Sequence, residues 1–324
     1  MAFKSLKSLS AGDIAWDDYT FAWRAVTDVS VLKESIKKVG ILVPITVQEK
    51  ATKKYRVVSG FRRLAAAKQL GFEKIPALEL DSSLSALNIF EKLLEENMAI
   101  HEFDPVDVSR IIQKCLTEFG LSREKVIETY LPMMGYGKSN RLYELIVPLV
   151  NLEPRWHRAI RDDIVPVDLA SSMVHEDVSV RSAFFDLIHA LKLGKNRQKE
   201  FWKMLKDISF IRDMSIAELL CMEEFTDILK LDKLTFSQKS DRFKKVLWEM
   251  RYPRYMEIED RFIRIVKEAK LPPQIRLQSA PFFEGNSFRL FFSFNNSGDF
   301  EFVLTHLKRL LSERVVEQLE KLIR

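Results

Sequence analysis

Cysteine is scarce in this sequence: the 324 residues contain only Cys115 and Cys221, which lie far apart. Two cysteines without paired spacing exclude a disulfide scaffold and a zinc ribbon, and they are typical of a protein from a reducing cytoplasm. Histidine is also rare, with five residues in all, among them His157. None has metal-ligand spacing or an accompanying nucleophile, so we interpret all five as surface or capping residues.

Long apolar runs are absent as well. No stretch of about 18 apolar residues occurs, which predicts that no helix spans a membrane. The opening "MAFKSLKSLSAGD" lacks the apolar centre of a secretory signal, so we expect a cytoplasmic protein that does not bind membrane. The net charge is only +5, with 51 basic and 46 acidic residues. This balance permits nucleic-acid binding without requiring it.

Strands and helices alternate over the first hundred residues. The predicted elements are helices at 28–39 and 64–70, strands at 41–49, 55–58 and 74–81, and a long helix from residue 82. Ser82 or Ser83 is available to cap the long helix. We therefore predict an α+β domain over residues 1–103.

The remaining chain is first helical and then mixed. Helical stripes with Gly and Pro stops predict an all-α domain over residues 104–250. Two strands joined through residues 284–287, and a single helix at 299–323, predict a small α+β unit over residues 255–324. Alternate residues of the second strand are apolar, namely Phe288, Leu290, Phe292 and Phe294. They indicate either a sheet core or, at an exposed edge, a dimer interface.

One short stretch, "VVSGFRRLAAAKQLGF", has the pattern of an anion site. A strand ends in a Ser-Gly turn, and a helix then opens on Arg62 and Arg63. The free N–H groups of the first helical turn and the two guanidinium groups would converge there. The alternative is that both arginines form surface ion pairs with Glu73 or Glu79.

Three stretches of this region resemble the ParB family of plasmid and chromosome partition proteins. "GILVPITV" resembles the family's Gly-Ile-x-Gln-Pro-Ile-x-Val segment, and "SGFRRLAAAKQLGFEKIPAL" resembles its Gly-Glu-Arg-Arg-x-x-Ala box. "EENMAIHEFDPVDV" is similar to the Glu-Asn-x-Gln-Arg-x-x-Leu-x-Pro box, and Arg24 stands where the family carries an arginine. The resemblance implies a ParB/sulfiredoxin-like N-terminal fold that binds CTP with Mg²⁺.

The resemblance also implies site residues. It assigns nucleotide binding to Ser59, Gly60, Phe61, Arg62, Arg63, Arg24, Glu96 and Asn97. Of these, Glu96 and Asn97 would lie beside the metal, and the two adjacent arginines would hold phosphate. Three positions depart from the family, since Phe61, Ala99 and Ile100 replace polar or charged residues. We therefore expect no CTP hydrolysis, or only weak hydrolysis.

The helical region continues the resemblance to about residue 175, with a helix-turn-helix layout. The presumed recognition helix opens with residues suited to DNA, namely Lys138, Ser139, Asn140, Arg141 and Tyr143. Downstream, Lys195 and Arg197 belong to a basic cluster that is either a solvated helix face or a contact with DNA phosphates.

The resemblance implies a DNA-binding protein in which CTP gates DNA association, in partition or in transcription regulation. It also implies a homodimer formed through the C-terminal unit, and leaves room for a partner ATPase. The first alternative is a regulatory or adaptor protein that keeps the fold without nucleotide turnover. The second is a ParB-type enzyme, a nuclease or kinase, although Phe61 stands where such an enzyme would need an acidic base. A sulfiredoxin is excluded, because "SGFRR" contains no cysteine.

Overall fold

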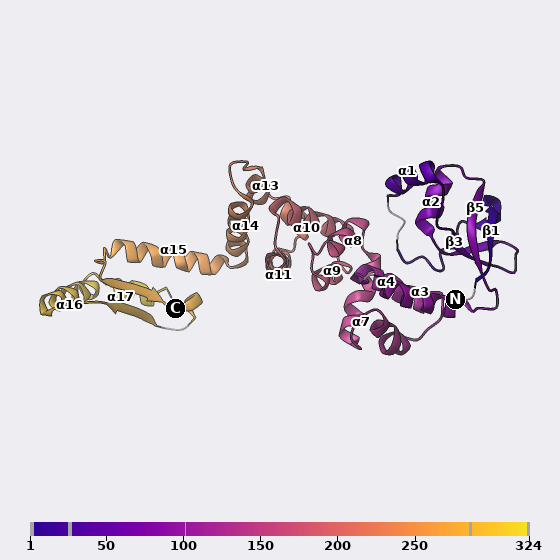
Figure 1. The fold of residues 1–324 in the computed structure, drawn as a ribbon. Coiled ribbons are helices and arrows are strands. Elements are labelled where there is room, and N and C mark those ends of the chain that lie inside the picture. The colour runs from indigo at the N-terminus through magenta and orange to yellow at the C-terminus, as the bar shows by residue number, and fades with distance from the viewer. Residues whose placement is uncertain (1–2, 25–27, 101, 285–286, 323–324) are drawn as a thin grey trace. The chain divides into compact units, whose positions relative to one another are not determined.

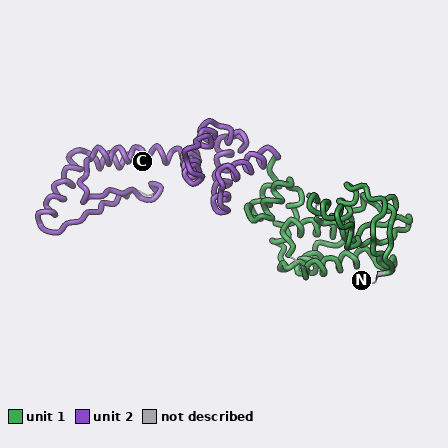
Figure 2. The backbone as a smooth tube through the Cα atoms, turned by 45° about the horizontal axis from the view of Figure 1, so that its top comes forward, with its two compact units in different colours: residues 1–177 green, residues 178–324 purple. Residues whose placement is uncertain are grey.

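The computed structural model describes residues 3–24, 28–100, 102–284 and 287–322. The chain divides into two compact units, residues 1–177 and residues 178–324 (Figure 2). The three-domain division at 103/104 and 250/255 stays a prediction. Within the described residues, no helix has the length and apolar character needed to cross a membrane.

The first unit contains a five-stranded mixed sheet with the order β1-β5-β3-β4-β2. Its strands are β1 (Phe3–Ser10), β2 (Ile14–Ala15), β3 (Ile45–Glu49), β4 (Tyr55–Ser59) and β5 (Lys74–Leu80). β3 pairs parallel with β5 and antiparallel with β4, so the strands predicted from the sequence lie at the centre of the sheet. Those three strands are confirmed.

Strand β1 was not expected, because its residues are mostly polar. It runs antiparallel to β5, and its Lys7 Nζ lies 2.5 Å from Oε2 of the buried Glu79. The hydrogen bonds that Lys7 donates to Glu79 and Tyr55 raise its pKa to about 12. An ion pair between β1 and β5 therefore stabilises this edge of the sheet. The hydrophobic pattern of a single strand cannot predict such a pair.

The three helices predicted in this region are present: α1 (Ser30–Val39), α2 (Phe61–Gln69) and α3 (Ala86–Met98) (Figure 1). The capping prediction is wrong, because Ser85 rather than Ser82 or Ser83 caps α3, its Oγ accepting from Asn88 N at 3.2 Å. Ser83 instead lies in a turn in which its backbone N–H donates to Asp81.

Short helices complete the first unit. They are α4 (Pro105–Thr117), α5 (Arg123–Lys125), a five-residue π-helical turn over Val126–Tyr130, α6 (Leu131–Met133), α7 (Asn140–Ile146), a 3-10 turn over Val147–Asn151, α8 (Pro154–Arg161) and α9 (Val167–Met173). Phe90 of α3 shares one buried apolar cluster with Ile111 of α4 and with Tyr130. The same cluster includes Trp23 and Val58, so the sheet and these helices pack as one body.

The second unit begins with five helices: α10 (Val178–Leu191), α11 (Lys195–Arg212), α12 (Ile216–Leu220), α13 (Glu223–Lys230) and α14 (Phe236–Arg251). It ends with α15 (Pro253–Glu268), the antiparallel pair β6 (Ile275–Ser279) and β7 (Phe288–Phe292), α16 (Ser297–Ser312) and α17 (Val315–Glu320). The predicted fold class is confirmed: an α+β domain, a helical region and a small C-terminal strand unit. Gly285 and Asn286 of the predicted turn lie outside the described residues.

The predicted helix at 299–323 is wrong as a single element. Arg314 adopts a left-handed conformation, with φ of 58°, between α16 and α17. No glycine or proline marks the break, and the apolar periodicity continues through it. The reversal lets Val315 and Leu319 bury against the core of this part of the chain, in the same cluster as Leu310.

Candidate functional site

Gly60 joins β4 to α2 in a conformation that suits glycine. Its φ is 95°, and a Cβ there would lie 2.9 Å from Ile45 Cγ2 and 3.2 Å from Ile45 Cα. The missing side chain lets the first turn of α2 approach β3 closely. The first turn of a helix leaves backbone N–H groups without partners inside the helix, so this turn can bind an anion.

The two arginines that follow have different surroundings. Arg63 Nη1 donates to the carbonyl oxygens of Val43 and Pro44, the latter at 2.5 Å, and burial lowers the pKa of its guanidinium. Arg62 is exposed, and its contact is a long one of 3.4 Å to the Asp28 carbonyl. Within the described chain, neither forms an ion pair with Glu73 or Glu79, so the surface-pair alternative does not apply.

Both arginines line a cavity of about 1020 Å³ in the first unit. Among the described residues, six arginines line it, but only two acidic residues, Glu102 and Asp104. A second cavity of about 500 Å³ shares five lining residues with it and adds the aromatic rings of Trp16 and Tyr19. The two cavities therefore adjoin, one rich in arginine and the other in aromatic rings.

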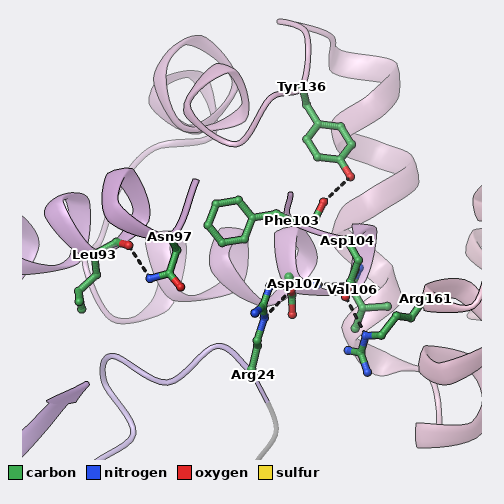
Figure 3. A network of polar contacts seen from close by, with 9 residues as sticks. All are labelled: Arg24, Leu93, Asn97, Phe103, Asp104, Val106, Asp107, Tyr136 and Arg161. Atoms are coloured by element: carbon green, nitrogen blue, oxygen red, sulfur yellow. Dashed lines mark hydrogen bonds and ion pairs between the residues drawn. The ribbon is translucent and has the colours of Figure 1, made fainter. Parts of the chain in front are cut away.

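An ion-pair network forms part of the larger cavity (Figure 3). Arg24 Nε donates to Asp107 Oδ2 at 2.8 Å, joining the segment before α1 to α4. Asp107 is wholly buried; burial, and then the charge of Asp104, raises the pKa of its carboxyl, while Arg24 opposes that shift. Asp104 caps α4 and accepts from Arg161 Nε at 2.8 Å, so α8 is joined to α4.

His157 is buried in α8, contrary to its interpretation as a surface or capping residue. Its Nε2 lies 2.8 Å from the Leu149 carbonyl, and its Nδ1 lies 3.2 Å from Arg110 Nη2. Burial lowers the pKa of the ring. A neutral imidazole with its proton on Nε2 satisfies both contacts, because Nδ1 can then accept from Arg110.

The structure brings most of the predicted nucleotide residues to this cavity. Those that line it are Arg24, Ser59, Gly60, Phe61, Arg62, Arg63 and Asn97. Phe61 is half-buried and packs against two core clusters. Asn97 donates from Nδ2 to the Leu93 carbonyl at 2.8 Å, whereas Glu96 is exposed and does not line the cavity. Among the described residues, no group of three His, Cys, Asp or Glu side chains could hold a metal.

Sequence reasoning missed the arginines that the helical segment contributes. Arg110 of α4 and Arg158 and Arg161 of α8 line the same cavity as Arg62. The stretch "EPRWHRAIRD" carries arginines three residues apart, which places them along one side of a helix. That spacing was the available signal, although it does not show what the side faces.

The residues predicted to contact DNA fall into several environments. Lys138 Nζ pairs with Glu128 at 3.0 Å, Ser139 caps α7, and Asn140 accepts from Arg123. Arg141 is exposed. Tyr143 is 6% exposed, with the Arg123 guanidinium over its ring. Its prediction as a DNA contact is corrected, because the apolar spacing of α7 turns it into the core.

The basic cluster of the second unit is engaged in ion pairs. Arg197 Nη2 lies 3.1 Å from Asp241, and Arg197 Nε lies 3.8 Å from Glu200. Lys195 is half-exposed at the start of α11. The ion pairs of Arg197 favour the structural alternative for that residue over a free phosphate contact.

Comparison with known proteins identifies the fold around this cavity. Residues 24–97 match the model of the ParB N-terminal domain. This segment is a ParB-type N-terminal domain. The match contains the glycine turn and the two adjacent arginines, and it ends at Asn97.

The curated proteins similar to this chain include partition proteins and nucleoid occlusion proteins. A probable chromosome-partitioning protein ParB from Neisseria meningitidis is 30% identical over 30% of this chain and 33% of its own length. A probable plasmid-partitioning protein ParB from Thermus thermophilus is 32% identical over 39% and 41%. A nucleoid occlusion protein from Geobacillus is 25% identical over 61% and 72%. The chain thus spans about a third of the first of these relatives.

Solved ParB structures are also similar. One is C-terminally truncated ParB from Caulobacter crescentus complexed with CTP-gamma-S, at 16% identity and a TM-score of 0.25 over 53% of this chain and 92% of that one. Another is the same protein complexed to the centromeric parS site, at 18% identity and a TM-score of 0.29 over 53% and 86%.

Proposed function

We propose that this ParB-like protein binds CTP with Mg²⁺ in the larger cavity and that the nucleotide gates its association with DNA. The observation that carries the proposal is the cavity itself, where the first turn of α2 and six arginines face only two acidic residues. A triphosphate supplies the negative charge that this surplus of arginines requires. Each guanidinium group can donate two parallel hydrogen bonds to phosphate oxygens.

The adjoining cavities suggest how the nucleotide lies. Phosphates would bind at the start of α2, close to Arg62. The base would enter the smaller cavity, which Trp16, Tyr19 and Trp23 line. Flat aromatic rings favour stacking with a pyrimidine base. Phe61 lines both cavities, so it lies where the base and the phosphates of the nucleotide would join.

Metal binding would rely mainly on the phosphates. Asn97 lines the cavity and offers an amide oxygen, whereas Glu96 is exposed outside it. Mg²⁺ keeps several waters and takes few protein ligands when phosphates are present, so one amide is compatible with binding. Phe61 offers no acid or base, and we therefore propose binding with weak turnover or none.

DNA association would use the helical region, and the active form would be a homodimer. Arg141 is the exposed basic residue at the start of α7, which makes it the best-placed of the predicted DNA contacts. A role in plasmid or chromosome partition or in transcription regulation, and a partner ATPase, belong to the same proposal. The competing function is an adaptor that keeps the fold without a nucleotide.

Calorimetric titration of the full chain with CTP and Mg²⁺ tests the proposal. We expect saturable binding that Arg62→Ala weakens by about tenfold or more, since a charge-assisted hydrogen bond contributes about 1.5–3 kcal/mol. Arg62 is the right probe, because Arg63 also holds backbone carbonyls. Lys92→Ala, an exposed change on α3 away from the cavity, serves as the control. Absence of binding by the unmutated protein would support the adaptor.

A further inference from the structure

A second group of arginines lines the larger cavity and comes from outside the matched N-terminal domain. Arg110 lies on α4, and Arg158 and Arg161 lie on α8, whereas the domain match ends at residue 97. The cavity therefore has one wall from the sheet domain and another from the helical segment. Both walls belong to the same compact unit.

Each arginine of this second wall retains capacity to bind an anion. Arg158 is exposed, and none of the described residues forms an ion pair or side-chain hydrogen bond with it. Arg110 is half-buried and held by the neutral His157 ring, which orients the guanidinium without cancelling its charge. Arg161 donates to Asp104 through Nε. Its two terminal nitrogens take no part in that bond and can donate to an anion.

The charge around the cavity is not balanced by its own acids. Asp104 accepts hydrogen bonds from Arg161 and from the first turn of α4, and the buried Asp107 forms an ion pair with Arg24. Glu102 is the remaining acidic residue in the lining, against Arg62, Arg110 and Arg158. Like charges held around one cavity repel one another until a polyanion enters.

We propose that Arg110, Arg158 and Arg161 form a second phosphate subsite, so that one nucleoside triphosphate is held by α2 and by α8 together. This inference rests on the proposed nucleotide function and adds the residues that bind the phosphate groups of the nucleotide. The bound triphosphate ties the helical segment to the sheet domain. His157 is a positioning residue, since it acts through Arg110.

The half-buried position of Arg110 favours a small polyanion over DNA at this subsite. Its guanidinium lies in a cavity, against a ring that is itself 8% exposed. A duplex backbone contacts side chains that extend from the protein surface, whereas a triphosphate is small enough to enter. DNA is therefore the competing occupant in the test.

The experiment compares CTP with CMP on the full chain, each titrated calorimetrically with Mg²⁺ present. Arg158→Ala and Arg161→Ala should each lower CTP affinity by about tenfold and leave CMP affinity unchanged, because the lost bonds go to the outer phosphates. Arg155→Ala removes the same charge from the same helix at a residue that does not line the cavity, and it should change neither affinity. Hydrogen exchange in α8 should slow on addition of CTP and not of CMP.

The outcomes separate this inference from the function on which it rests. No CTP binding by the unmutated protein overturns both. Normal CTP binding by the Arg158 and Arg161 variants overturns the second subsite alone and leaves the first intact. Equal losses of affinity for CTP and CMP would mean that the substitutions act on the structure. Loss of DNA binding with unchanged CTP affinity would assign these arginines to DNA. Either result overturns the proposal. Arg158→Lys should restore part of the CTP affinity, since the charge remains.

Discussion

In this protein, residues of the same type make different contacts because their surroundings differ. Arg62 and Arg63 are adjacent and identical, yet one is exposed and the other holds two carbonyl groups. Gly60 places both of them, because only a residue without a Cβ can pass so close to Ile45. The same reasoning separates this glycine from Gly71 at the far end of α2.

We predict that Gly60→Ala destabilises the protein more than Gly71→Ala. Both glycines have positive φ, so each alanine incurs backbone strain of about 1–2 kcal/mol. Only at Gly60 does the new Cβ also clash, and overpacking adds about 1–3 kcal/mol, whereas nothing lies within 4 Å at Gly71. Denaturant unfolding of both variants measures the difference. Equal losses of stability would show that β3 yields to the added methyl group.

At the scale of elements, helices of the first unit bury one side in the core and leave basic residues on another. α7 turns Tyr143 and Ile146 into the core, while Arg141 stays exposed. Helix α8 likewise buries Trp156 and His157 and presents Arg158 at the cavity. Each helix can therefore contact a ligand without disturbing the packing that holds it.

We predict that Arg141→Ala weakens binding to a random-sequence duplex and lowers the slope of log affinity against log salt by about 1, as for one lost phosphate contact. Fluorescence anisotropy over a salt series measures both quantities. Lys125→Ala, an exposed change on α5, should leave them nearly unchanged. If the two variants behave alike, α7 does not meet DNA.

At the scale of the whole molecule, the second unit carries apolar side chains that its own described residues leave exposed. Phe288 packs on the core of α15, α16 and α17, but Phe292 and Phe294 are 42% and 52% exposed. The stripe predicted from the sequence thus begins in the core and continues onto the surface. A two-stranded sheet with open edges and exposed aromatic rings favours pairing with a second copy.

We predict that the full chain is a dimer and that Phe292→Glu combined with Phe294→Glu makes it monomeric, because charge at the paired surface opposes its burial. Light scattering after size-exclusion chromatography gives the mass. The control is Phe210→Glu on α11, since Phe210 is 90% exposed elsewhere in the same unit. Dissociation by the control variant alone would move the interface to α11.

The sequence by itself determined the elements whose cause is local. Apolar periodicity and Gly stops were sufficient for α1, α2 and the central strands, and the Ser-Gly-Phe-Arg-Arg turn was sufficient for the first half of the site. Such features depend on neighbours within a few positions, so a short window of residues contains their whole explanation.

Only the tertiary structure decided which distant residues complete the site. Arg24 meets Asp107 across 83 positions, Arg110 meets His157 across 47, and Arg161 meets Asp104 across 57. Strand β1 and the burial of Tyr143 likewise depend on partners elsewhere in the fold. These contacts form because α4 packs against α8 and shares an apolar cluster with α3 and Trp23, which brings their polar neighbours into reach. No local pattern encodes that meeting.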